Sequence, residues 1–191
     1  MRGLRIIAYS VSIYILAMSA AVSFAATKEA DNPVGKTYYT AVNIWFEKPE
    51  QIFSSNFHKG QFIPINTKVT ITGYKNSGFT FTDNNDIAYK IVYVPKHSVL
   101  PIKEIFNQYF SKQEVSMSRF TEEERKNIET GTIAVGMSKE AVLAAYGYPL
   151  AHQTPSIKNN QWKYWKNRIV SFLVYFSKEG KVAKIGDNMR F

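Results

Sequence analysis

The sequence predicts an α+β protein in which a small N-terminal β-barrel is followed by a helix and a two-layer α-α-β-β-β domain. Short alternating segments separated by tight turns indicate the barrel. An amphipathic pattern indicates the helix, and two capped helices followed by three strands indicate the two-layer domain. We therefore expect a signal peptide, the barrel, the connecting helix and the two-layer domain over residues 1–25, 36–98, 99–118 and 119–191.

The first 25 residues have the pattern of a secretory signal peptide. Arg2 and Arg5 precede an apolar run from Ile6 to Ala21, and Ser23-Phe24-Ala25 places small residues at the −3 and −1 positions of a cleavage site. The apolar run is shorter than the roughly 20 residues that span a membrane, so we expect cleavage after Ala25. No cysteine follows the run. We therefore expect an exported, periplasmic protein without a lipid anchor.

The composition narrows the possible classes of function. The chain has no cysteine, which excludes disulfides, zinc–thiolate sites and cysteine nucleophiles. Its formal net charge is +9, and basic proteins favour anionic partners such as nucleic acid, acidic polymers or lipid head groups. Export argues against nucleic acid. Because the lysines are spread along the chain without a dense basic run, a solubilising surface charge explains them equally well.

Five short strands are predicted between residues 36 and 98. The first alternates over residues 38–46, with Tyr38, Thr40, Val42, Ile44 and Phe46 on one side, and a loop marked by proline and glycine follows. The other strands are predicted over residues 61–65, 68–72, 79–82 and 87–94. Within this region Phe62-Ile-Pro-Ile-Asn-Thr-Lys-Val-Thr-Ile71 resembles the loop-to-strand segment of bacterial SH3-like barrels, in which a small-residue turn precedes a Lys-Val strand.

Three helices are predicted after the barrel. The first carries apolar residues at helical spacing from Ile102 to Phe110, and we expect it to dock on the barrel or to fill the joint between domains. The second begins at Thr121 with a capping box completed by Glu124, and it runs to about Thr130 before Gly131. For the third, the predicted N-cap is Ser138 and the helix covers residues 139–146, before Gly147 and Pro149 end it.

The last segment predicts a three-stranded antiparallel meander over residues 161–165, 169–176 and 181–185. We expect one face of its middle strand to carry the helices, through Val170, Phe172, Val174 and Phe176. Trp162 and Tyr164 are assigned to this core face, and Lys163 and Trp165 to the other. The opposite face of the middle strand (Ile169, Ser171, Leu173 and Tyr175) is too apolar for a fully solvated surface. It either packs on the barrel or forms a patch for a partner.

Several motifs of this segment together resemble the SmpA/OmlA family, BamE-like proteins of outer-membrane β-barrel assembly. They are Gly136-Met-Ser-Lys-Glu-Ala-Val142, Gly147-Tyr-Pro149, Trp162-Lys-Tyr164, the strand to Phe176, and Gly180-Lys-Val182. The same two-layer fold resembles the repeats of β-lactamase-inhibitor proteins. The resemblance implies the fold and a non-catalytic, protein-binding role. The chain departs from the family because it lacks a lipobox cysteine and carries a barrel in front.

No motif in the sequence indicates a reaction. His58, His97 and His152 are far apart in sequence, and we expect all three in solvent-exposed loops rather than as metal ligands. Asp83-Asn-Asn-Asp86 lacks the glycine and distal glutamate of a calcium loop, so we interpret it as a hairpin turn. Nucleophile elbows, phosphate loops and dinucleotide fingerprints do not occur. We expect no enzymatic activity, no catalytic residue, no metal and no cofactor.

The leading hypothesis is an exported, non-enzymatic adaptor or assembly factor that binds an envelope protein. We predict that its binding surface lies on the face of the meander turned away from the helices, with aromatic and arginine residues of the type that dominate interfaces. The predicted binding residues are Trp165, Arg168, Ile169, Leu173 and Tyr175.

Two other hypotheses remain open from the sequence. One is a cell-wall module that binds peptidoglycan, with the positive charge also allowing an anionic lipid surface and with Tyr39 and Trp45 as exposed strand aromatics. The other is an inhibitor of an envelope enzyme, suggested by fold analogy alone.

Overall fold

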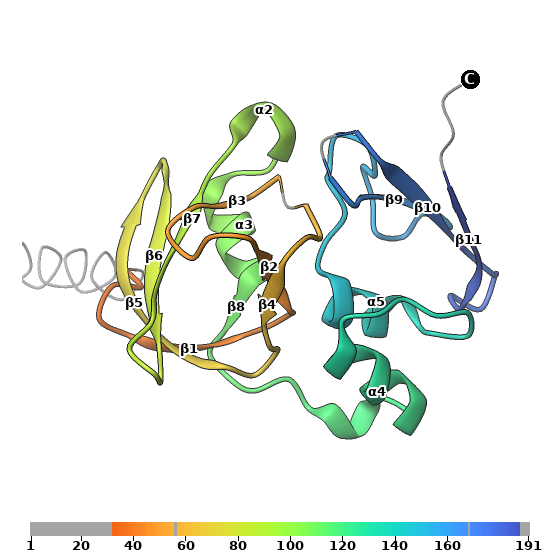
Figure 1. Ribbon diagram of the computed structural model, residues 1–191, viewed down its shortest axis with the longest axis horizontal. Helices are drawn as coiled ribbons and strands as arrows, with labels where there is room; N and C mark the ends of the chain where they lie inside the picture. Colours follow the sequence, from red (N-terminus) through yellow and green to blue (C-terminus); the bar gives the residue numbers. More distant parts are fainter. Residues whose placement is uncertain (1–31, 56, 168, 188–191) are drawn as a thin grey trace, which may run out of the picture. The chain divides into compact units, whose positions relative to one another are not determined.

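The computed structural model describes residues 32–55, 57–167 and 169–187, and the predicted signal peptide lies outside them. The described residues from Val34 onward belong to one compact unit. This unit has a mixed α+β fold with few helices and several sheets (Figure 1). Within the described residues, no helix is both long and apolar enough to cross a membrane.

The N-terminal part of this unit (residues 34–111) is built mainly of β-strands. One sheet has the strand order β3-β7-β6-β5-β1-β8 and curls into a half-barrel, while β2 and β4 form a separate pair (Figure 1). The pairs are antiparallel except for β3, which runs parallel to β7. The bounds are β1 Thr37–Thr40, β2 Ile44–Phe46, β3 Ile52–Phe53, β4 Gln61–Ile63, β5 Lys68–Lys75, β6 Gly78–Asp83, β7 Ala88–Val92 and β8 Phe110–Ser111.

The predicted first strand is interrupted, although its alternation is correct. The structure has β1 and β2 with a break at residues 41–43, because the backbone amide of Ala41 bonds to Tyr109 and that of Asn43 bonds to Ala144 instead of continuing a ladder. All five side chains assigned to the inner side, from Tyr38 to Phe46, are buried. Strands β3 and β8 were not predicted, because two residues are too few to show a periodicity.

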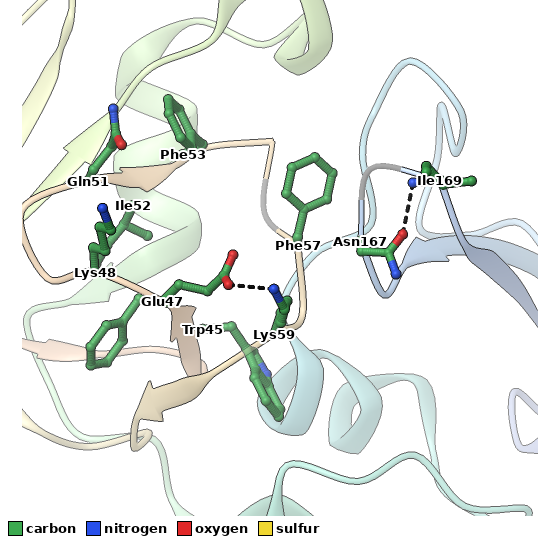
Figure 2. Close-up of a pocket in the computed structure, with 11 residues that line it drawn as sticks. Trp45, Glu47, Lys48, Gln51, Ile52, Phe53, Phe57, Lys59, Asn167 and Ile169 are labelled. Carbon is green, nitrogen blue, oxygen red and sulfur yellow. Dashed lines mark hydrogen bonds and ion pairs between the residues drawn. The ribbon is translucent and has the colours of Figure 1, made fainter.

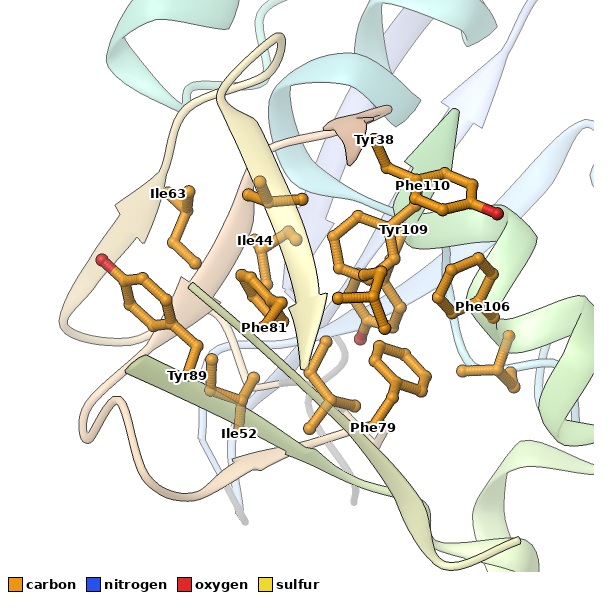
Figure 3. Close-up of a cluster of buried hydrophobic side chains, with 14 of the residues drawn as sticks. Tyr38, Ile44, Ile52, Ile63, Phe79, Phe81, Tyr89, Phe106, Tyr109 and Phe110 are labelled. Atoms are coloured by element: carbon orange, nitrogen blue, oxygen red, sulfur yellow. The ribbon is translucent and has the colours of Figure 1, made fainter. Parts of the chain in front are cut away.

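The N-terminal core is dominated by aromatic rings. Helix α3 (Ile102–Tyr109) follows the short helix α2 (Pro95–Ser98) and buries Ile105, Phe106 and Tyr109 against the sheet, as its amphipathic pattern predicts. The ring of Phe106 meets that of Phe79 edge to face, with 5.3 Å between centroids (Figure 3). Edge-to-face packing is favourable because the positive ring edge meets the negative ring face. The helix therefore docks on the sheet, which is one of its two predicted placements.

The C-terminal part (residues 117–187) contains the predicted helices and meander. After a 3-10 turn at Met117–Arg119, helices α4 (Glu122–Thr130) and α5 (Lys139–Tyr146) have the predicted bounds. The three-stranded sheet has the order β11-β10-β9, and both of its pairs are antiparallel. Its strands are β9 Gln161–Trp165, β10 Ser171–Phe176 and β11 Val182–Asp187.

The predicted capping box of α4 is present, and its carboxylate does more than cap. Glu124 accepts hydrogen bonds from the backbone amides of Thr121 at 3.1 Å and Ser138 at 2.7 Å, and from Lys181 Nζ at 3.1 Å. Burial raises the pKa of Glu124, but these hydrogen bonds outweigh burial and lower the pKa to about 2. The side chain thus joins the start of α4 to the N-cap of α5 and to the residue before β11.

The C-terminal core lies between the helices and one face of the sheet. Trp162 and Tyr164 of β9 are almost fully buried there, as predicted, together with Phe172, Val174 and Phe176 of β10. The prediction for Val170 is wrong, since this side chain is 43% exposed. It lies before β10 in a hairpin turn, where its amide bonds to the side chain of Asn167. Strand periodicity does not extend into such a turn.

Candidate functional site

Asn43 connects the N-terminal part to both helices of the C-terminal part. Its side chain is 1% exposed, and its amide nitrogen donates to the carbonyl oxygens of Ile128 at 2.7 Å and Ala145 at 3.1 Å. Its amide oxygen accepts from the backbone amide of Ile65 at 2.8 Å. A buried amide with its hydrogen bonds made in this way fixes one orientation of the groups around it. The backbone amide of the same residue bonds to the carbonyl oxygen of Ala144 at 2.9 Å, so both the side chain and the backbone of Asn43 contact α5.

A cluster of aromatic rings surrounds His58 beside this contact. The imidazole lies flat on the ring of Tyr146, with 3.7 Å between centroids and 13° between planes, and Trp45 and Tyr164 approach it with their edges. Its two ring nitrogens contact the carbonyl oxygens of Trp165 and Tyr146. The prediction of a solvent-exposed loop is therefore wrong for His58, which is 9% exposed. Contacts to residues far along the chain bury it.

Burial also changes the acid–base behaviour of His58. Desolvation lowers its pKa to about 4 and outweighs the two backbone hydrogen bonds, which act to raise it. The imidazole is therefore neutral at neutral pH. A neutral ring needs no counter-ion in the aromatic surroundings. It has one N–H, so it donates to only one of the two carbonyl oxygens, and the Tyr146 oxygen is the nearer of them.

A cleft of about 550 Å³ opens next to the aromatic cluster, and we call it the Ile169 cleft (Figure 2). Its walls come from the segment between β2 and residue 59 and from the hairpin between β9 and β10. The lining residues are Trp45, Phe46, Glu47, Lys48, Gln51, Ile52, Phe53, Phe57, Lys59, Asn167 and Ile169.

The Ile169 cleft combines apolar groups with a few polar ones. Lys59 and Glu47 form an ion pair at 2.7 Å on its wall, with both side chains more than half exposed. Asn167 Oδ1 accepts the backbone amide of Ile169 at 2.8 Å, which braces the tip of the hairpin (Figure 2). Ile169 itself is 88% exposed. An apolar side chain held open beside a cleft is suited to contact a bound molecule.

A second cleft of about 480 Å³, which we call the histidine cleft, shares part of its wall with the Ile169 cleft. Phe53 and Phe57 line both clefts. Trp165 is held in the wall by a hydrogen bond from its Nε1 to Gln153 Oε1 at 3.1 Å, and Lys163 Nζ lies 4.9 Å from the centre of its ring. The lining residues are Phe53, Ser55, Phe57, Val94, His97, Leu150, His152, Gln153 and Trp165.

The five predicted binding residues do not share one surface. Trp165 lines the histidine cleft and Ile169 lines the Ile169 cleft. Leu173 and Tyr175 are half-buried on the face of the sheet opposite Phe172 and Val174, and they line neither of these two clefts. Arg168 lies outside the described residues. The predicted surface is therefore divided between cleft walls and the outer face of the sheet.

Sequence reasoning did not find Phe53, Phe57 or His58 as site residues. They belong to a segment that we predicted as a loop, and periodicity carries no information there. One signal was available in the sequence. The stretch from Ser54 to Gly60 is polar except for Phe57, and Phe53 comes directly before it. Apolar rings in a loop need either a core or a partner to cover them.

The described residues contain no group of three or more histidine, aspartate or glutamate side chains that could hold a metal ion. Comparisons with known proteins found no matching family model, no significantly similar curated protein and no significantly similar solved structure.

Proposed function

We propose that the protein is an exported, non-enzymatic envelope protein that acts as a protein-binding adaptor or assembly factor and holds a polypeptide segment in the Ile169 cleft. In this proposal residues 36–98 are an SH3-like barrel, residues 99–118 a connecting helix and residues 119–191 a BamE-like two-layer domain. Export rests on the signal-peptide pattern of residues 1–25.

The observation that carries the proposal is the exposed Ile169 beside the rings of Phe53 and Phe57. Burial of an apolar side chain contributes roughly 25 cal/mol per Å², so a partner that covers these groups gains binding free energy. The amides of Gln51 and Asn167 line the same cleft. A polypeptide offers both apolar side chains and backbone hydrogen-bonding groups, which matches this mixed lining.

The position of β3 adds a second reason to favour a polypeptide. This strand is at the end of the six-stranded sheet, and both of its residues, Ile52 and Phe53, line the Ile169 cleft. The edge of a sheet is where an extended peptide can add as a further strand. A segment in the cleft could therefore pair with the sheet while its side chains contact Phe57 and Ile169.

Site-specific photo-crosslinking in cells tests the proposal. A photoreactive residue at position 169 should give a discrete crosslinked protein, and the additional change Phe57→Ala should weaken that crosslink. The matched control is position 135, because Val135 is also apolar and 64% exposed but lies outside both clefts. Equal crosslinking at positions 135 and 169, or none at position 169, would contradict the proposal.

The contacts of Trp45 support peptidoglycan binding less well than they support the adaptor hypothesis. The peptidoglycan hypothesis uses Trp45 as an exposed aromatic residue on a strand. This ring packs against Phe62 and Tyr146, with centroid distances of 4.9 and 5.6 Å. Only part of the ring is left to stack on a sugar. Sedimentation with purified sacculi separates this hypothesis from the adaptor, since the adaptor needs no co-pelleting.

A further inference from the structure

Two histidines that are 55 residues apart in sequence meet in the histidine cleft. The ring centroids of His97 and His152 are 5.3 Å apart, and the planes are tilted by 42°. Nδ1 of His152 is 2.8 Å from the backbone carbonyl oxygen of His97. We propose that this pair binds one divalent transition-metal ion of the kind that prefers imidazole, namely Cu²⁺, Ni²⁺ or Zn²⁺.

The hydrogen bond from His152 to the carbonyl oxygen of His97 determines the tautomer of the His152 ring. A carbonyl oxygen can only accept, so Nδ1 of His152 carries the hydrogen in this contact and Nε2 of the neutral ring carries the lone pair. Metal-binding histidines in proteins characteristically donate their other ring nitrogen to a carbonyl or carboxylate group in this manner. His152 is therefore already in the tautomer that a metal ion at Nε2 requires.

The separation of the rings also fits a shared ion. Imidazole nitrogen binds zinc at about 2.0–2.1 Å, which places each ring centroid about 3.2 Å from the metal and two rings about 5 Å apart at a tetrahedral angle. The observed 5.3 Å agrees with this spacing. Both side chains are at least partly exposed, which leaves them room to rotate toward a shared ion.

The remaining coordination positions open into the cleft. The cavity of about 480 Å³ has room for the water molecules that complete the coordination of an ion held by two protein ligands. The proposed site has two imidazole nitrogens as its protein ligands. The affinity of the site for divalent ions should therefore follow the general order for such ions, with Cu²⁺ bound most tightly. Mg²⁺, which prefers oxygen ligands, should not bind here.

Calorimetric titration of the protein without a histidine tag tests the site. CuCl2, NiCl2 and ZnCl2 should each bind with a stoichiometry of one, and MgCl2 should give no heat. The single changes His97→Ala and His152→Ala should each lower the affinity by tenfold or more, and circular dichroism should show that both variants are folded. The control Gln153→Ala changes another residue of the same cleft and should leave the affinity within about threefold.

Electron paramagnetic resonance of the Cu²⁺ complex identifies the ligands. Two imidazole nitrogens are expected, and one should be lost in each histidine variant. Unchanged copper binding in both variants, a signal without imidazole nitrogen, or no binding of any of the three ions would overturn the proposal. These measurements do not involve the Ile169 cleft, so their outcome is independent of the crosslinking experiment on the proposed adaptor function.

Discussion

The imidazole of His58 lies flat on the ring of Tyr146 and also hydrogen-bonds to the backbone carbonyl oxygen of that same residue. Tyr146 is the last residue of α5, and its carbonyl is one of the groups that a helix end leaves without an intrahelical partner. His58 therefore satisfies the end of a helix in the C-terminal part from a segment of the N-terminal part. The same contact excludes water from the imidazole.

This burial predicts that the protein loses stability on mild acidification. The pKa of His58 is about 4 in the folded state and 6.5 in the reference state, so the unfolded chain binds more protons between these values. Stability is then complete above about pH 6.5 and falls as the pH drops toward 4. The full difference corresponds to about 3 kcal/mol. Urea denaturation at several pH values between about 7.5 and 5 measures the loss.

The change His58→Gln provides the control, because glutamine cannot take up the proton. Its stability should be lower at neutral pH but nearly independent of pH between about 6.5 and 5. Glu124, whose pKa is lowered to about 2, contributes stability that is lost only as the pH falls below its reference value of 4.5. Equal pH dependence of the two proteins in the upper window would contradict the assignment to His58.

Replacement of Asn43 by alanine should destabilise the protein strongly. The change removes three hydrogen bonds and leaves the carbonyl oxygens of Ile128 and Ala145 and the amide of Ile65 without that partner. The carbonyl oxygen of Ile128 keeps the amide of Gly131 as a donor at 3.2 Å, so two groups are left unsatisfied. At about 1–3 kcal/mol for each buried unsatisfied group, we expect a loss of about 2–6 kcal/mol in denaturant unfolding. Asn84→Ala, in the exposed turn after β6, should change stability by less than about 0.5 kcal/mol.

Gly131 should tolerate no side chain, for two reasons. It ends α4 with a φ of 63°, and a Cβ atom there would lie 2.6 Å from the ring of Trp45 and 2.8 Å from that of Phe62. Gly136 also has a positive φ, of 93°, but a Cβ atom there would meet nothing within 4 Å. We therefore expect Gly131→Ala to cost about 1–3 kcal/mol more than Gly136→Ala. Equal midpoints in thermal unfolding would show that the rings move aside easily.

The sequence predicts the elements of the C-terminal part better than it predicts the contacts between the two parts. The reason is that capping signals act between residues close in sequence, whereas these contacts join residues far apart in sequence. The capping box of Thr121 and the N-cap of Ser138 act within three residues, and α4 and α5 have the predicted bounds. By contrast, Asn43 bonds to a residue 85 positions away, and His58 bonds to residues 88 and 107 positions away.

Such long-range contacts also determine which residues come together in the candidate site. Trp165 and Ile169 were predicted as binding residues of one sheet face, but the hairpin turn after β9 separates them into different clefts. His97 and His152 gave no sequence pattern, and only the fold brings their rings together. A pattern of local periodicity places a residue on a face, but it does not say which distant loop will lie beside it.

The last prediction concerns Glu124 and Lys181, whose ion pair is asymmetric. The carboxylate is 7% exposed and bonds to two backbone amides, whereas the ammonium group belongs to a side chain that is 47% exposed. Glu124→Ala removes the partner of both amides and should cost about 2–3 kcal/mol. Lys181→Met removes only the exposed partner and should cost less than about 1 kcal/mol. Denaturant unfolding of both variants at neutral pH measures the difference, and a larger loss for Lys181→Met would show that the ion pair, rather than the amide contacts, holds the carboxylate.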